Sequence, residues 1–139
     1  MVMRDFAADW RRAVARAVFH CAECGAQAAR VALVVDEALP AGGDGRPDAL
    51  IVEADFYGEW AQTVGTSGLM PVASALAAGD AAALYAVEPL WAPFYCPACE
   101  RSYCHDHWQF RLVFDEDWPD WYEETIGTCP RGHQRVLDD

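Results

Sequence analysis

The residues of this 139-residue chain that are best suited to chemistry are its cysteines and histidines. All six cysteines and two of the four histidines fall into four close pairs. Such a pair bends the backbone into a knuckle that can direct both side chains at one ion, and eight ligands are the number that two closed tetrahedral Zn²⁺ sites need. The pairs are Cys21-x2-Cys24, Cys96-x2-Cys99, Cys104-x2-His107 and Cys129-x3-His133.

The spacing also indicates which pairs share an ion. Four residues separate Cys99 from Cys104, and an extended segment of that length spans about 16 Å. We therefore expect an interleaved arrangement, in which the first and third pairs hold one zinc and the second and fourth pairs hold the other. The sequential arrangement, with the first pair beside the second, stays open. His107 is the expected third-pair ligand. His105 directly follows Cys104, and side chains of consecutive residues are poorly placed to bind one ion together.

Three other uses of the cysteines are possible. Disulfides need an oxidising compartment, and a redox CxxC needs only one such motif. A zinc deaminase would combine Cys21 with Cys96 and Cys99 and would use Glu23 as the proton-transfer group, but most of the paired residues would then have no role. We expect two structural zinc ions and no catalytic residue, because a closed site has no open coordination position.

The stretch from Tyr95 to Trp108 resembles the inner segment of the cross-brace zinc fingers, the RING and FYVE families, in its order C-x2-C-x4-C-x2-H. The closing pair, Cys129 and His133, looks like the final ligand pair of a RING. The resemblance implies a divergent relative with a small treble-clef-like core, two zincs on interleaved pairs, and a long insertion between the first two pairs.

RING proteins often act as ubiquitin-ligase scaffolds, and the resemblance implies contacts to a conjugating enzyme at Ala22, Trp108 and Arg135. The first hypothesis for function is nevertheless a non-enzymatic adaptor that uses its zincs for structure and binds a protein partner. A ligase-like scaffold for a ubiquitin-like conjugation system is the alternative, and a zinc-dependent deaminase is the weaker one.

The charge balance excludes several partners. Ten arginines and no lysine stand against 22 acidic residues, and the formal net charge is −12. Nucleic acids and anionic membranes both require a cationic surface, so neither is an expected partner. No apolar run reaches the roughly 20 residues of a membrane span, and the first residues lack a signal-peptide pattern. We expect a cytoplasmic protein whose partner is another protein, with either a basic surface or the character of a conjugating enzyme.

A segment near the C-terminus mixes acidic and aromatic residues. Between Asp115 and Glu124 the large aromatics Trp118, Trp121 and Tyr122 lie among six acids. Such a segment could dock a basic partner. The alternative is that the aromatics face a small core and the acids keep the loop soluble.

Periodicity predicts the elements that must position these residues. Apolar residues at helical spacing predict an amphipathic helix over residues 4–20, and β-branched runs predict strands at 30–35 and 49–56, paired as a hairpin around a loop at 40–47. A short helix is expected at 71–78, ended by Gly79, and further strand candidates lie at 84–87, 90–95 and 111–114. The expected fold is a single α+β domain: a helix and first knuckle at 1–27, an inserted small sheet plus helix at 28–94, and the main zinc module at 95–139.

Overall fold

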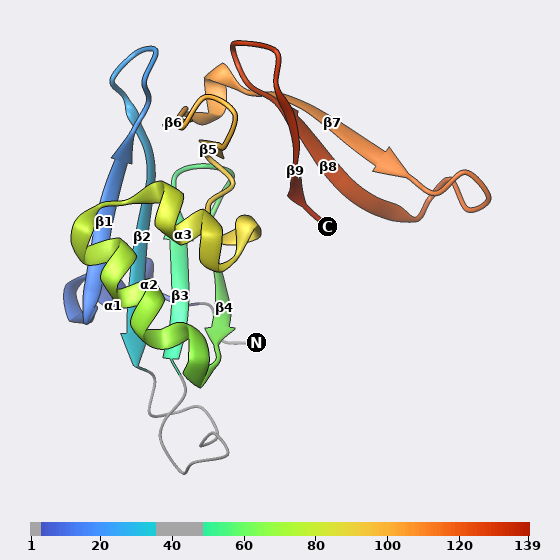
Figure 1. Ribbon diagram of the computed structural model, residues 1–139. Helices are drawn as coiled ribbons and strands as arrows, with labels where there is room; N and C mark the ends of the chain where they lie inside the picture. Colours follow the sequence, from blue (N-terminus) through green and yellow to red (C-terminus); the bar gives the residue numbers. More distant parts are fainter. Residues whose placement is uncertain (1–3, 36–48) are drawn as a thin grey trace.

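The computed structural model describes residues 4–35 and 49–139. Within these residues the chain forms three antiparallel sheets and three α-helices, so the predicted α+β class is confirmed. Figure 1 shows a four-stranded sheet with helices against it and a separate three-stranded sheet near the C-terminus. The short strands β5 (Tyr95–Cys96) and β6 (Arg101–Ser102) lie between these two sheets.

The four-stranded sheet is an antiparallel meander in the order β1-β2-β3-β4. Its central strands are rich in valine, leucine and isoleucine, which suit a sheet buried on both faces. All six residues of β3 are buried. The pairing of β2 with β3 confirms the predicted hairpin, while its expected loop at 40–47 lies outside the described residues. The strands are β1 (Ala15–His20), β2 (Gln27–Val35), β3 (Ala49–Ala54) and β4 (Trp60–Val64).

Two helices cover one face of this sheet, α2 (Thr66–Ala78) and α3 (Ala81–Val87). Their buried residues Leu76 and Leu84 belong to the same core as Leu33 and Ile51 of the sheet. α2 starts earlier than predicted, but it ends as expected at Gly79, which has a φ of 64°. Glycine tolerates this left-handed conformation without a steric penalty.

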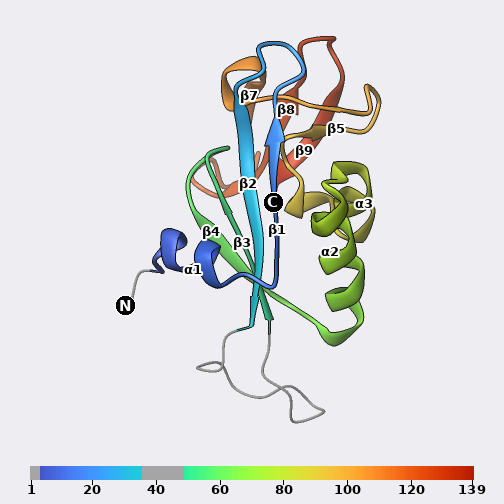
Figure 2. The same cartoon turned by 90° about the vertical axis from the view of Figure 1, so that its left-hand side faces the viewer.

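The opposite face carries α1 (Phe6–Arg12), as Figure 2 shows. Phe6 packs on a second, smaller core that includes Val34 and Val52. The side chain of Asp5 accepts a hydrogen bond from the backbone N–H of Ala8 and so caps the helix. The sheet is therefore the middle of three layers.

The C-terminal third is built from short strands and turns. A 3₁₀ turn at Pro89–Trp91 leads into the small hairpin of β5 (Tyr95–Cys96) and β6 (Arg101–Ser102). A second 3₁₀ turn, at His105–His107, precedes the three-stranded sheet in the order β7-β8-β9. These strands are β7 (Gln109–Phe114), β8 (Tyr122–Thr128) and β9 (Gln134–Asp138). The β7–β8 hairpin extends away from the rest of the molecule (Figure 1).

Residues 4–20 do not form the single helix that their spacing predicted. α1 ends at Arg12, and β1 follows from Ala15. In β1 the side chains of Ala17 and Phe19 are buried and their neighbours are more exposed, which is a period of two. A short apolar run satisfies both periods, and pairing with β2 decides between them.

Other expectations require correction as well. Residues 84–87 lie in α3 and not in a strand, because Asp80 caps a helix there by accepting from the N–H of Ala83. Residues 90–95 form mostly a turn that ends in β5. The strand at 111–114 is confirmed within β7, whereas β4, β8 and β9 were not predicted.

The expected boundary between residues 27 and 28 does not separate two units. β2 begins at Gln27 and pairs with β1, so the N-terminal segment is part of the sheet that was expected to be inserted. The longest described helix, α2, has 13 residues. None of the helices within residues 4–35 and 49–139 has the length and apolar character of a membrane span.

Candidate metal centres

The eight paired residues gather into two groups of four. The donor atoms within each group lie within 4.8 Å of one another. The grouping corresponds to the interleaved arrangement and not to the sequential one. Site 1 contains Cys21, Cys24, Cys104 and His107, and site 2 contains Cys96, Cys99, Cys129 and His133.

The distances within the groups fit the edges of a zinc tetrahedron. With Zn–S near 2.3 Å and Zn–N near 2.0–2.1 Å, two sulfurs are separated by about 3.8 Å and a sulfur and a nitrogen by about 3.6 Å. In site 1, the Sγ atoms of Cys24 and Cys104 are 3.8 Å apart, and His107 Nδ1 is 3.5 Å from the Sγ of Cys21 and 3.2 Å from the Sγ of Cys104.

Site 2 has matching separations. The Sγ atoms of Cys99 and Cys129 are 3.7 Å apart, and His133 Nδ1 is 3.2 Å, 3.5 Å and 3.8 Å from the Sγ atoms of Cys99, Cys129 and Cys96. Such sulfur separations are far longer than the roughly 2.05 Å of a disulfide bond, and the six cysteines are free. The disulfide alternative is therefore wrong for this structure.

Backbone amides favour ionisation of one cysteine in each group, Cys21 in site 1 and Cys129 in site 2. Burial disfavours the thiolate of Cys21, but hydrogen bonds from backbone amides of its own group outweigh burial and lower the thiol pKa to about 7. Cys129 behaves alike: burial opposes ionisation, and the amides of His133 and Arg131 bring the pKa to about 7. Burial raises the pKa of Cys96 and of Cys104 to about 11. A coordinated metal ion deprotonates such thiols outright.

Site 1 connects the four-stranded sheet to the C-terminal third. Cys21 follows the last residue of β1, and its N–H donates to the carbonyl of Ala26 to close the β1–β2 turn. The N–H of Ala22 donates to the carbonyl of Ser102 at the end of β6. Cys104 lies two residues beyond β6, so a shared ion would fix two segments that are distant in sequence.

Site 2 connects β5 to the three-stranded sheet. Cys96 is the last residue of β5, and Cys129 directly follows β8. The turn from Cys129 to His133 closes with a hydrogen bond from the Cys129 N–H to the His133 carbonyl, 2.9 Å long. Gly132 has a φ of 90° in this turn, a conformation that side chains disfavour.

The predicted ligand His107 lies in site 1, and His105 does not. The ring of His105 packs on Phe110 instead, with their centroids 4.6 Å apart. The deaminase arrangement is wrong, because Cys21 lies in a different group from Cys96 and Cys99. Each group also supplies four protein ligands, so an ion bound there would have no open position for water.

Trp108 is not the surface residue that the RING resemblance implied. Only 4% of it is exposed, and its Nε1–H donates to the carbonyl of Tyr103. A Cβ atom placed on Gly127 would lie 2.9 Å from Cε3 of Trp108, so the indole rests directly on the backbone of β8. Trp108 therefore belongs to the core between the two sheets.

Arg135 is likewise occupied within the molecule. Its Nη1 donates to the carbonyls of Ala92 and Tyr95, both at 2.7 Å, and its Nη2 donates to the carbonyl of Pro89 at 2.7 Å. The guanidinium also stacks over the ring of Tyr85, 5.0 Å from its centroid. Arg135 therefore fixes β9 to the turn that precedes β5, and its guanidinium is engaged by carbonyls of the chain itself.

The acidic and aromatic segment lies at the end of the β7–β8 hairpin. Trp118 is 73% exposed and Trp121 is 71% exposed, and Tyr122 is also exposed. The alternative in which these aromatics face a small core is therefore wrong. These three aromatic side chains are therefore accessible to a partner, whereas Trp108 is not.

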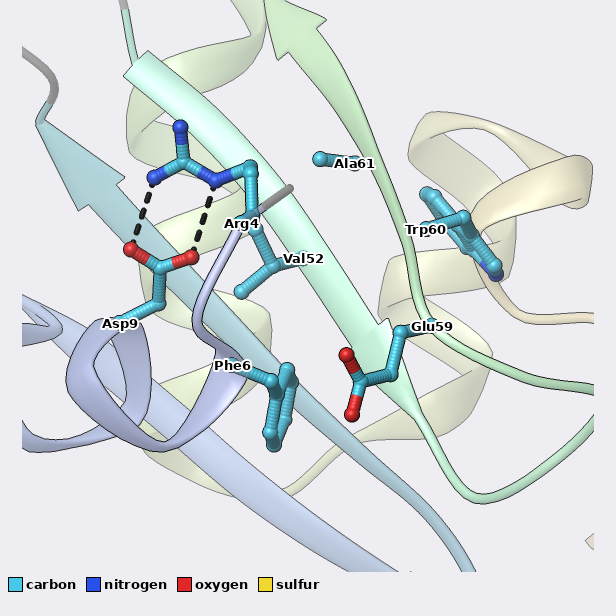
Figure 3. A pocket seen from close by; sticks show the side chains of 7 residues that line it. All are labelled: Arg4, Phe6, Asp9, Val52, Glu59, Trp60 and Ala61. Atoms are coloured by element: carbon cyan, nitrogen blue, oxygen red, sulfur yellow. Dashed lines mark hydrogen bonds and ion pairs between the residues drawn. The ribbon is translucent and has the colours of Figure 1, made fainter. Parts of the chain in front are cut away.

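Two features of the four-stranded sheet and its helices, together called the body, were not predicted. Glu53 of β3 is fully buried, and neither of its carboxyl oxygens has a hydrogen-bond partner among residues 4–35 and 49–139. Burial raises its pKa well above the usual value. The second feature is a cavity of about 200 Å³ beside α1, where the ion pair of Arg4 and Asp9 faces Glu59 across an apolar floor that contains Phe6 (Figure 3). No local sequence pattern marks either feature, because both depend on strand pairing.

Comparison with protein families matches residues 11–139 to the family described as Domain of unknown function (DUF8328). The chain belongs to this family. The DUF8328 match includes both candidate metal centres and the whole β7–β8 hairpin. No curated protein and no solved structure matches the chain.

Proposed function

We propose that this protein is a non-enzymatic interaction module that holds two structural Zn²⁺ ions. One observation supports the zinc assignment: in both groups, neighbouring donor atoms lie 3.2–3.8 Å apart, close to the edge lengths of a zinc tetrahedron. A set of three thiolates and one imidazole is typical of structural zinc sites.

The two sites would act as cross-links between distant segments. Site 1 would join the β1–β2 turn to the start of the β7 region, and site 2 would join β5 to the β8–β9 turn. Zinc binding at such a site contributes directly to the free energy of folding. The chemistry that the ion supplies is structural, and the chain's own residues position the hairpin.

The adaptor role is supported by what the two sites leave exposed. A closed ligand set provides no activated water, which argues against metal catalysis. The β7–β8 hairpin presents two exposed tryptophans, and aromatic residues are enriched at protein interfaces. We therefore assign partner binding to the hairpin rather than to Trp108 or Arg135.

The ligase-like alternative has one supporting observation, which is the interleaved order of the ligand pairs. Of the three contact positions that the resemblance implied, Trp108 is buried and Arg135 is hydrogen-bonded to backbone carbonyls. Ala22 alone would have to make the contact. The adaptor proposal requires none of these contacts and is preferred.

Native mass spectrometry of the reduced protein tests the zinc assignment. We expect two zincs per chain in the wild type and a loss of one in His107→Asn. The matched control is His105→Asn, which changes an adjacent histidine outside the ligand group and should retain both ions. A wild-type chain that binds no zinc, or a His107→Asn variant with both ions held as tightly as before, would contradict the proposal.

A further inference from the structure

We propose that the β7–β8 hairpin binds a cationic, arginine- or lysine-bearing peptide segment of a protein partner. The segment would stack its cations on the exposed indoles and place its apolar side chains on the adjacent face of the hairpin. This inference rests on the proposed adaptor function, because it specifies the partner chemistry of the same hairpin.

The two indoles are exposed on an ordered turn. The carboxylate of Asp115 accepts hydrogen bonds from the backbone N–H groups of Asp117 and Trp118, both at 2.8 Å. The N–H of Asp115 donates to the carbonyl of Trp121, and the N–H of Trp121 donates to the carbonyl of Trp118. A turn fixed in this way loses little conformational entropy when it binds a partner.

An apolar face continues from the tip toward the body. Leu112 and Phe114 alternate along β7 and so point to the same side of the hairpin as Phe110. Near the body, Phe110 packs against the main core, but Leu112 and Phe114 are exposed. Tyr122 adds to this face, with its ring 6.2 Å from that of Phe114. The hairpin thus extends an interior surface into solvent.

Charge decides what kind of segment fits this face. Six acidic residues surround the aromatics, and no basic residue occurs from residue 112 to residue 130. Arginine and lysine cations are attracted both to carboxylates and to the faces of indole rings. A second copy of this chain is a poor occupant, because two molecules of net charge −12 repel each other.

Hydrogen bonds of the Tyr122 hydroxyl hold the apolar face of the hairpin in place. Tyr122 Oη donates to the carboxylate of Asp138 at 2.8 Å and is hydrogen-bonded to Thr125 Oγ1 at 2.6 Å. These bonds hold the Tyr122 ring beside Phe114 on β7. The apolar part of the face therefore exists without a partner, and the acidic residues around the tip remain available for cations.

The test is a fluorescence titration of the zinc-loaded full chain with the peptide (Arg-Leu)4. The exposed indoles should shift to shorter wavelength on binding, and affinity should fall as salt is raised. Trp118→Ala/Trp121→Ala should weaken binding about tenfold or more. Because this variant lacks the two fluorescent indoles, its binding is measured by calorimetry. Asp117→Asn/Asp120→Asn should weaken binding and flatten the salt dependence.

Matched controls separate this inference from the zinc proposal. Glu59→Gln/Glu100→Gln removes the same charge away from the hairpin and should bind like the wild type, and (citrulline-Leu)4 offers a neutral peptide that should not bind. Equal binding of both peptides, no binding of (Arg-Leu)4, or a dimer that needs Trp118 would overturn the inference. The zinc content of the same samples is measured by native mass spectrometry. Two zinc ions per chain without peptide binding would contradict this inference alone, whereas a chain without zinc would contradict the proposed function.

Discussion

The four-stranded sheet and the three-stranded sheet differ in how much of their surface is buried in a core. Every residue of β3 is buried, with α2 and α3 on one face and α1 on the other. In contrast, no residue of β7 is fully buried, and only Gly127 of β8 is. The first sheet has the packing of an ordinary core, whereas the second has two ligand groups at its base. A sheet with so little buried area needs another source of stability, and a zinc ion bound in each ligand group would provide one.

Zinc removal should produce the largest difference in stability between the two sheets. Each structural zinc contributes an apparent binding free energy of about 10–16 kcal/mol, which exceeds the roughly 5–15 kcal/mol stability of a typical domain. We expect a chelator to abolish hydrogen-exchange protection of β7, β8 and β9 before that of β2 and β3. Equal loss of protection in both sheets would show that the body depends on zinc as much as the hairpin does.

Two tryptophans allow the same comparison at the level of side chains. Trp108→Ala would leave a cavity between the sheets and should lower the free energy of unfolding by about 3–5 kcal/mol. Trp118→Ala changes an exposed residue and should alter it by no more than about 0.5 kcal/mol. Urea unfolding at fixed zinc concentration measures both variants. Similar losses for the two would contradict the assignment of Trp108 to the core.

Arg135 tests how β9 is joined to the body. Arg135→Lys keeps the charge but cannot reproduce three hydrogen bonds to carbonyls in a fixed planar geometry. We expect a loss of about 1–3 kcal/mol in unfolding free energy. Arg111→Lys, on the exposed part of β7, is the control and should be near neutral. Thermal unfolding of the two variants at equal zinc content distinguishes them.

Glu53 gives a pH dependence that belongs to the body alone. Its pKa is raised in the folded state by burial, so the folded protein binds more protons than the unfolded one above the ordinary glutamate pKa. Unfolding free energy should therefore fall as pH rises above about 4.5, by up to about 1.4 kcal/mol per pH unit. Glu53→Gln should remove this component.

The matched control is the exposed Glu59→Gln, which should keep the wild-type slope. Asp9 and Asp55 give the opposite dependence at lower pH, where they should make the free energy of unfolding fall as the pH falls. Their pKa values are lowered: at Asp55 first by the hydrogen bond from Arg30, and at Asp9 by its bonds to Arg4 and Arg12, which outweigh burial. The difference between wild type and Glu53→Gln in chemical denaturation isolates the buried carboxyl, and identical slopes would refute the prediction.

The sequence alone determined the ligand types of the candidate metal centres. Ligand type and close spacing are local properties, so the eight residues were predictable without a fold. Strongly apolar runs such as 30–35 and 49–56 were predictable as strands for the same reason, and Gly79 marked the end of α2. The acidic character of the hairpin also followed directly from composition.

Tertiary structure decided the accessibility of each residue. Trp108 and Trp118 are the same residue type in similarly aromatic segments, but only Trp108 meets a glycine on a neighbouring strand. Residues 15–20 became a strand because β2 offered backbone partners, and the pairing of ligand groups depended on how the chain returns from β6 to the β1–β2 turn. Each of these outcomes rests on contacts between residues far apart in sequence, and local spacing carries no information about such contacts.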